Sequence, residues 1–171
     1  QKGFDLIAHV LDELLQMDIQ LAVLGTGDNN YEEMFRNAAV RYPGKVSANI
    51  KYDGALAQRV YAGTDMFLMP SLYEPCGLSQ IFSLRYGTVP IVRETGGLKD
   101  TVMPYNEFTG EGTGFSFANY NAHEMLDTVK RAISFYKNKY IWEKIVKSGM
   151  KQDFSWSKSA KEYMELYEKM V

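Results

Sequence analysis

Residues 65–92 of the chain read DMFLMPSLYEPCGLSQIFSLRYGTVPIV, and their pattern gives the clearest indication of the fold class. The stretch begins with a short apolar run at 65–69, continues through a loop into a helical segment at 77–86, and ends in a second apolar run at 88–92. Short apolar runs separated by a helix are typical of buried strands in a βαβ unit, whose two strands pair in parallel. The stretch therefore predicts an α/β fold.

The same alternation of apolar runs and helical segments extends in both directions. Towards the N-terminus, the periodicity predicts a helix over 4–15, a strand over 19–24, a helix from 30 to about 43, a strand over 45–51 and a helix over 55–62. Towards the C-terminus, we expect a surface loop over 104–114, a short strand over 114–117, and helices over 121–136, 140–150 and 157–170. Two helices are expected to begin in capping boxes, at Asn30 with Glu33 and at Asn121 with Glu124. The whole pattern predicts one α/β domain over 1–171, with a parallel sheet covered by helices on both faces and a helical tail.

The composition favours a soluble globular domain and argues against several classes of partner. Of the 171 residues, 46% are hydrophobic and 23% are charged, and the formal net charge is −2. We therefore expect no general attraction to nucleic acid or to an anionic membrane. No apolar run approaches the ~20 residues of a membrane span, and the first residues lack the apolar core of a signal peptide. The single cysteine, Cys76, leaves no internal disulfide to form, which favours a reducing, cytoplasmic location. A start at Gln1 rather than Met suggests an excised segment.

Two glycines after the first strand, Gly25 and Gly27, are weak evidence for a dinucleotide site. The third glycine of the G-x-G-x-x-G fingerprint would fall at position 30, where Asn30 stands, and no acidic residue about 20 positions on is clear. A tight turn between strand and helix explains both glycines. An NAD-dependent oxidoreductase is therefore a disfavoured alternative.

Cys76 stands at the expected start of a helix, where a thiol can be activated as a nucleophile. A nucleophile also needs a base, and the two histidines, His9 and His123, lie near the chain ends without any sequence link to Cys76. A small packing or ligand-lining cysteine is the better interpretation. No Cys-x-x-Cys or His-x-x-x-His pair occurs either, so we expect no metal site.

The loop after the strand at 65–69 carries a carboxylate and leads into a helix that begins near a glycine. Ligands of open parallel sheets bind beyond the carboxyl ends of strands. The free N–H groups of Gly77, Leu78 and Ser79 are suited to a phosphate, helped by the helix dipole. Glu74 would repel that phosphate, so it is better suited to accept hydrogen bonds from sugar hydroxyls. A solvated loop carboxylate and a routine helix cap explain the same residues equally well.

A second glycine pair, Gly96 and Gly97, follows Thr95 just after the strand at 88–92. Loops after neighbouring strands can converge on one crevice, which makes a ligand site more plausible for both loops. Lys2 offers a mobile positive charge for phosphates. A solvated terminal lysine is the alternative.

Several segments together resemble the bacterial glycogen synthase and plant starch synthase family, and the resemblance covers essentially the whole chain. The most specific is YEPCGLSQ at 73–80. Further segments occur in the family's order: QKGFD at 1–5, LGTG at 24–27, YAGTD at 61–65, YGTVPIV at 86–92, TGGLKDTV at 95–102 and FSW at 154–156.

The resemblance implies the C-terminal, Rossmann-like domain of a GT-B fold, which binds a nucleotide-sugar donor against a second domain. The implied reaction transfers glucose from ADP-glucose to the non-reducing end of an α-1,4-glucan, with retention and without a cofactor or metal. By analogy, Lys2 contacts the donor phosphates, Tyr52 packs on the adenine and Glu74 contacts the glucose. The resemblance implies two catalytic residues, Glu74 and Lys2, and a donor-binding set of Gln1, Lys2, Tyr52, Glu74, Cys76, Gly77, Leu78, Ser79, Thr95, Gly96 and Gly97.

The chain departs from the wider GT-B pattern in two respects. Phe82 stands where a second glutamate would follow Glu74 by eight positions, so no ribose contact from a carboxylate is carried over. The family's N-terminal Lys-x-Gly-Gly loop and the acceptor-side residues are absent, so we expect little or no catalysis by this segment alone. Two questions stay open: whether the donor is ADP-glucose or UDP-glucose, and whether the chain is a non-catalytic carbohydrate or nucleotide module with the same fold.

Overall fold

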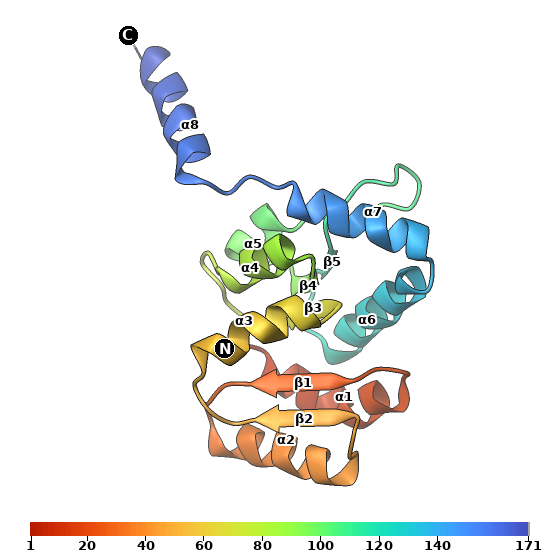
Figure 1. Ribbon diagram of the computed structural model, residues 1–171. Helices are drawn as coiled ribbons and strands as arrows, with labels where there is room; N and C mark the ends of the chain where they lie inside the picture. The colour runs from red at the N-terminus through yellow and green to blue at the C-terminus, as the bar shows by residue number, and fades with distance from the viewer. Residues whose placement is uncertain (171) are drawn as a thin grey trace.

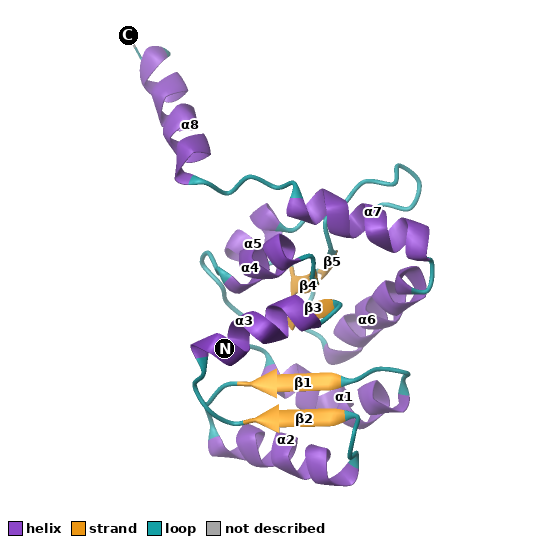
Figure 2. Cartoon of the chain, viewed as in Figure 1, coloured by secondary structure: helices purple, strands orange, loops and turns teal. Residues whose placement is uncertain are grey.

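The computed structural model describes residues 1–170, in which helices and strands alternate along most of the chain (Figures 1 and 2). The strands are β1 (Leu21–Leu24), β2 (Val46–Asn49), β3 (Met66–Met69), β4 (Val89–Arg93) and β5 (Phe115–Phe117). The helices are α1 (Phe4–Gln16), α2 (Asn29–Arg41), α3 (Gly54–Gly63), α4 (Ser79–Tyr86), α5 (Gly96–Thr101), α6 (Ala122–Tyr136), α7 (Lys139–Met150) and α8 (Trp156–Glu168).

All the strand pairs are parallel, as predicted, but the strands form two sheets rather than one. One sheet pairs β1 with β2, and the other has the order β3-β4-β5. In the larger sheet Met66 lies opposite Val89, and Ile91 lies opposite Phe115. Side-chain packing joins the two sheets, because α1 contacts α6 and the residues of both sheets share one apolar core.

The larger sheet has its centre in β4, which is buried along most of its length. Val89, Ile91 and Val92 are each at most 1% exposed. Helices α4, α5, α6 and α7 all contact this strand. An unbroken apolar run is what a strand covered on both faces requires. The predicted covering of the sheet by helices is therefore confirmed for β3-β4-β5.

Helices α2 and α4 do not begin at the residues that the sequence predicted. At α2 the capping residue is Asp28, whose carboxylate accepts a hydrogen bond from the Asn30 N–H at 2.8 Å, so the predicted capping box of Asn30 with Glu33 is wrong. Helix α4 begins at Ser79 instead of residue 77, because Gly77 has a φ of +73° in the left-handed region. Only half of the predicted capping box at Asn121 is present. The Asn121 side chain accepts hydrogen bonds from the N–H groups of His123 and Glu124, but the Glu124 carboxylate accepts from the N–H groups of Ala118 and Asn119 and not from that of Asn121.

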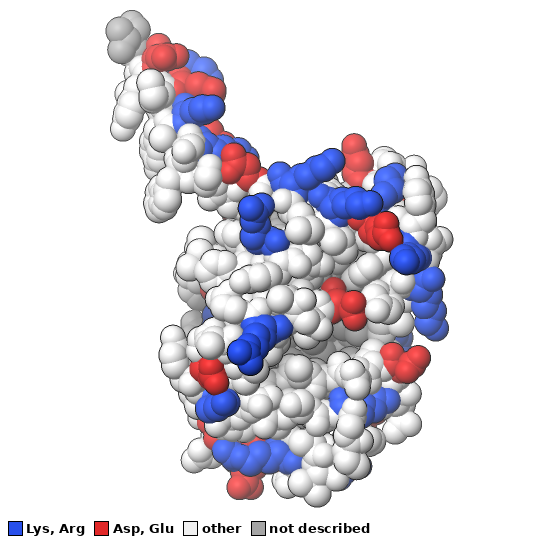
Figure 3. Space-filling model, viewed as in Figure 1, with Lys and Arg blue, Asp and Glu red and all other residues white. Residues whose placement is uncertain are grey.

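The short helix α5 was not predicted, because its six residues are too few to show helical periodicity. The predicted helical tail is present as α8, which extends away from the rest of the molecule and buries none of its residues (Figure 1). In residues 1–170, no helix combines the length and the apolar character needed to span a membrane. Acidic and basic side chains are interspersed on the face shown in Figure 3, in keeping with the small net charge.

Candidate functional site

The N-terminal segment lies against the carboxyl end of β3. Leu72 donates its N–H to the carbonyl of Gln1 at 3.0 Å. Gly3 has a φ of +78°, and a Cβ there would stand 2.1 Å from the Pro70 carbonyl oxygen. Only glycine permits so close an approach of two backbones. Residues from the first positions and from the loop after β3 are thereby brought together, although about 70 positions separate them.

Lys2 and Glu74 form an ion pair in this region. The Lys2 Nζ lies 2.5 Å from Glu74 Oε2, and the two side chains are 58% and 9% exposed, respectively. The carboxylate is thus largely withdrawn from solvent and has the ammonium as its charged partner. Lys2, which the sequence suggested as a mobile cation, is instead held against the one carboxylate of the loop.

The two glycine-containing loops, at 73–78 and 95–97, touch each other. Gly97 donates its N–H to the Pro75 carbonyl at 3.1 Å. A Cβ on Gly96 would lie 2.2 Å from the Glu74 carbonyl oxygen, and one on Gly97 would lie 2.4 Å from that of Cys76. The expected convergence of the two loops therefore occurs, and both glycines are required by it.

Helix α4 presents its first turn beside these loops. Leu78 is its capping residue and provides no side-chain cap, so the first N–H groups, including that of Ser79, have no acceptor within the helix. Gln80, which is fully buried, donates from Nε2 to the carbonyls of Cys76 at 3.0 Å and Gly77 at 2.9 Å. Gln80 thus draws these carbonyls toward the interior and shapes the turn that leads into the helix. No role for Gln80 was predicted.

Arg93, at the end of β4, is a second residue whose role was not predicted. Its guanidinium donates to the carbonyls of Ser71 at 2.8 Å and Leu72 at 2.5 Å. It also lies over the ring of Tyr120, 5.6 Å from the ring centroid. Tyr120 in turn donates its hydroxyl to Asp5 at 2.5 Å, and burial together with this bond raises the pKa of Tyr120 to about 12. The one feature of the sequence that could have indicated a role for Arg93 is that a charged residue ends an otherwise apolar strand.

The remaining predicted site residues are less constrained. Tyr52 lies between β2 and α3 with its side chain 93% exposed, so the structure does not draw it into the Lys2–Glu74 group. Cys76 is exposed as a free thiol. Thr95 caps α5 without a side-chain hydrogen bond. Within residues 1–170, no three His, Cys, Asp or Glu side chains gather into a group that could hold a metal.

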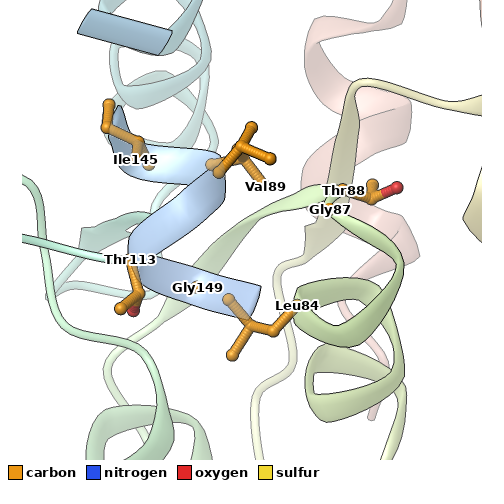
Figure 4. A pocket seen from close by; sticks show the side chains of 8 residues that line it. Leu84, Gly87, Thr88, Val89, Thr113, Ile145 and Gly149 are labelled. Atoms are coloured by element: carbon orange, nitrogen blue, oxygen red, sulfur yellow. The ribbon is translucent and has the colours of Figure 1, made fainter. Parts of the chain in front are cut away.

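A small depression elsewhere in the molecule belongs to packing and not to this site. It lies between the end of α4 and helix α7 and has no room for a water molecule (Figure 4). A Cβ on Gly149 would stand 2.8 Å from the Leu84 Cδ2, so a glycine at this position lets α7 lie close to α4. The Lys2–Glu74 region remains the candidate site.

Comparison with known proteins gives a consistent result. The family model described as glycosyl transferases group 1 matches residues 1–148. A glycogen synthase of Clostridium novyi (strain NT) is 61% identical over all 171 residues, which cover 36% of that protein. A glycogen synthase of Lachnospira eligens is 62% identical over 168 residues, which cover 98% of the chain and 35% of that protein. The chain thus spans little more than a third of the length of these relatives.

Solved structures agree with this result. The catalytic domain of Starch Synthase IV from Arabidopsis thaliana, bound to ADP and acarbose, superposes with a TM-score of 0.86 and 35% identity, covering 99% of this chain and 36% of that one. The C-terminal domain of a glycosyl transferase group 1 family protein from Francisella tularensis shares the fold at a TM-score of 0.66 and 16% identity, covering 87% of this chain and 76% of that one. The expected Rossmann-like domain of a GT-B protein is confirmed. The chain belongs to the glycosyl transferases group 1 family.

Proposed function

We propose that the chain is the donor-binding domain of a glycogen or starch synthase, which transfers glucose from ADP-glucose to the non-reducing end of an α-1,4-glucan with retention. The observation that carries the proposal is the Lys2–Glu74 ion pair beside the first turn of α4. It places a cation suited to a diphosphate next to a carboxylate suited to sugar hydroxyls. Relatives that are 61–62% identical and named glycogen synthase support the reaction. A structural relative bound to ADP supports an adenine nucleotide.

The proposed work of the site is to stabilise charge. Breaking the bond between glucose C1 and the phosphate oxygen leaves its electron pair, and so negative charge, on the departing ADP. Lys2 and the free N–H groups of Leu78 and Ser79 are the donors that we assign to this diphosphate. Donors fixed in advance around a developing charge contribute several kcal/mol to lowering a barrier. Glu74 orients the glucose by accepting hydrogen bonds from its hydroxyls.

Retention follows from a front-face route, which we propose on the resemblance to the family. The acceptor hydroxyl attacks C1 on the face from which the phosphate departs, and its proton moves to the leaving phosphate oxygen. The products are a glucan one residue longer and ADP. The route uses no metal or organic cofactor, so the residues named here supply positioning and electrostatic stabilisation alone.

The other residues complete the donor site in this proposal. Tyr52 packs on the adenine with its free ring, while Gln1 and Cys76 border the phosphates. Thr95 lines the glucose side, with Gly96 and Gly97 beside it. The acceptor glucan is bound by a second domain outside this chain, so the chain binds donor without efficient transfer. A cytoplasmic location is part of the proposal and agrees with the free thiol.

Calorimetric titration of the chain with ADP, UDP and NAD at equal concentrations tests the proposal. We expect preferential binding of ADP, and weaker binding of both ADP and UDP in Lys2→Met, because the two nucleotides share the diphosphate that Lys2 contacts. Stronger binding of NAD would instead favour a dinucleotide site at Gly25 and Gly27. Glucose transfer from ADP-glucose to glycogen by the full-length protein distinguishes an enzyme from a non-catalytic module, since a module would bind ADP and transfer nothing.

A further inference from the structure

We propose that Arg93 is a positioning residue for the donor site, acting through the backbone of Ser71 and Leu72. It holds these two peptide groups so that the N-terminal segment docks in register and Lys2 stands within reach of a diphosphate at the first turn of α4. The role rests on the proposed function, because ADP is the ligand of that function. The placement of the residues rests only on the hydrogen bonds around Arg93.

The guanidinium of Arg93 is directed at protein carbonyls. Nε donates to Ser71 O at 2.8 Å and Nη2 to Leu72 O at 2.5 Å, while Nη1 lies 3.4 Å from Ala118 O. Three of its five N–H donors are thus directed at backbone oxygens of the protein. A planar fork that grips two successive carbonyls fixes the orientation of both peptides, which a lysine ammonium reproduces poorly.

The peptides that Arg93 holds carry the N-terminal segment. The N–H of Leu72, whose carbonyl faces Arg93, donates to Gln1 O at 3.0 Å. This bond fixes the residue immediately before Lys2. Two residues further along the loop, Glu74 receives the Lys2 ammonium. A shift of the Ser71–Leu72 peptides thus moves both members of the ion pair.

The same network also fixes the other end of the N-terminal segment. The Tyr120 ring lies against the Arg93 guanidinium, and its hydroxyl donates to Asp5 at the start of α1. Lys2 therefore sits between two anchors, at Gln1 and Asp5, which both lead back to Arg93. The arrangement ties the ends of β3, β4 and β5 to the start of α1, and it explains why a charged residue closes an apolar strand.

A double-mutant cycle on the chain, read out by ADP affinity, tests the inference. We expect Arg93→Met and Lys2→Met each to raise the Kd for ADP about tenfold, the factor for one charge-assisted contact with a phosphate. In the double variant the Kd should stay within about twofold of that of Lys2→Met, because Arg93 acts through Lys2. Additive losses would show that Arg93 binds phosphate directly and would overturn the proposal, as would an unchanged Kd in Arg93→Met.

Arg131→Met is the matched control. Arg131 also donates to a backbone carbonyl, that of Tyr105 at 3.0 Å, and lies over the rings of Phe115 and Phe135. It belongs to α6, and its contacts are outside the donor site. Its removal should lower the melting temperature as Arg93→Met does, while the ADP affinity stays as in the wild type.

Hydrogen exchange provides a readout that does not depend on any ligand. The Leu72 amide should exchange at least about tenfold faster in Arg93→Met than in the wild type, because its bond to Gln1 is released. If Arg93→Met does not fold, Arg93→Lys takes its place in the experiment. This variant keeps the charge and should show the same faster exchange of the Leu72 amide, to a smaller degree. Unchanged protection of this amide in a folded variant would overturn the proposal. Faster exchange in a chain that does not bind ADP would leave the positioning role intact and refute the proposed function instead.

Discussion

Replacing Glu74 by Gln should tighten the binding of ADP, although Glu74 belongs to the donor site. Lys2 must leave Glu74 before it can reach a diphosphate, so the ion pair opposes the binding of ADP. Exposed ion pairs contribute about 0.2–1 kcal/mol, and breaking a buried pair costs about 3–5 kcal/mol. With side chains 58% and 9% exposed, this pair falls between the two ranges, at about 1–2 kcal/mol.

In Glu74→Gln the ion pair no longer has to be broken, so the Kd for ADP should be about 5- to 30-fold lower than in the wild type. The affinity for ADP-glucose should not rise in the same way. In the variant the sugar hydroxyls donate to a neutral amide instead of a carboxylate, and each hydrogen bond to the charged group contributes about 1.5–3 kcal/mol. The preference for ADP-glucose over ADP should therefore fall in the variant. Calorimetric titration of the wild type and the variant with both ligands, at low and high salt, measures each affinity.

Asp12→Asn is the matched control for this prediction. It also removes the carboxylate of an ion pair, with Arg41 at 2.8 Å, but that pair joins α1 to the end of α2. Its ADP affinity should equal that of the wild type. Binding of ADP to Glu74→Gln that is no tighter than to the wild type would refute the idea that the ion pair and the diphosphate compete for Lys2.

Three further changes test other parts of the structure. Gly97→Ala places a Cβ 2.4 Å from the Cys76 carbonyl oxygen, so scanning fluorimetry should show a melting temperature several degrees lower and titration a loss of ADP binding, whereas Gly63→Ala, with nothing within 4 Å, should be neutral or stabilising by about 0.5–1 kcal/mol. The fold raises the pKa of Tyr120 to about 12, so its stabilising contribution is complete below pH 10 and is lost as the pH rises toward 12. Urea unfolding at pH 9 and pH 11.5 should therefore show a smaller loss of stability in Tyr120→Phe than in the wild type; equal losses would contradict this assignment. Tyr52→Leu should weaken ADP about tenfold and leave pyrophosphate binding unchanged, since the exposed ring is assigned to the base; an equal loss for both ligands would remove that assignment.

Apart from the short helix α5, the order of helices and strands could be predicted from the sequence, because apolar periodicity reports burial directly. The run at 88–92 predicted a strand buried on both faces, and β4 is that strand. The division into two sheets could not be predicted, since the same apolar runs suit either pairing. The start of α2 was misplaced because Asp28 and Asn30 are both good capping residues, and only the fold decides which of them caps.

The site was predictable where a local motif carries the chemistry, and unpredictable where long-range contacts do. The loop from Glu74 to Ser79 and the glycines at 96 and 97 could be proposed from their places after strands. The pairing of Lys2 with Glu74 joins residues 72 positions apart. The roles of Gln80 and Arg93 depend on hydrogen bonds to backbone carbonyls, and a side chain's sequence context says little about which carbonyl it will meet.

Mapping of amide chemical shifts by NMR during titration of the chain with ADP-glucose shows where the donor binds, because it locates even weak binding. We expect perturbations concentrated at Lys2, Leu78, Ser79 and Gly96, and in Lys2→Met about tenfold more donor should be needed to reach the same shifts at the other three. Perturbations centred on Gly25 and Gly27, or none at millimolar donor, would contradict the placing of the donor at the carboxyl ends of β3 and β4.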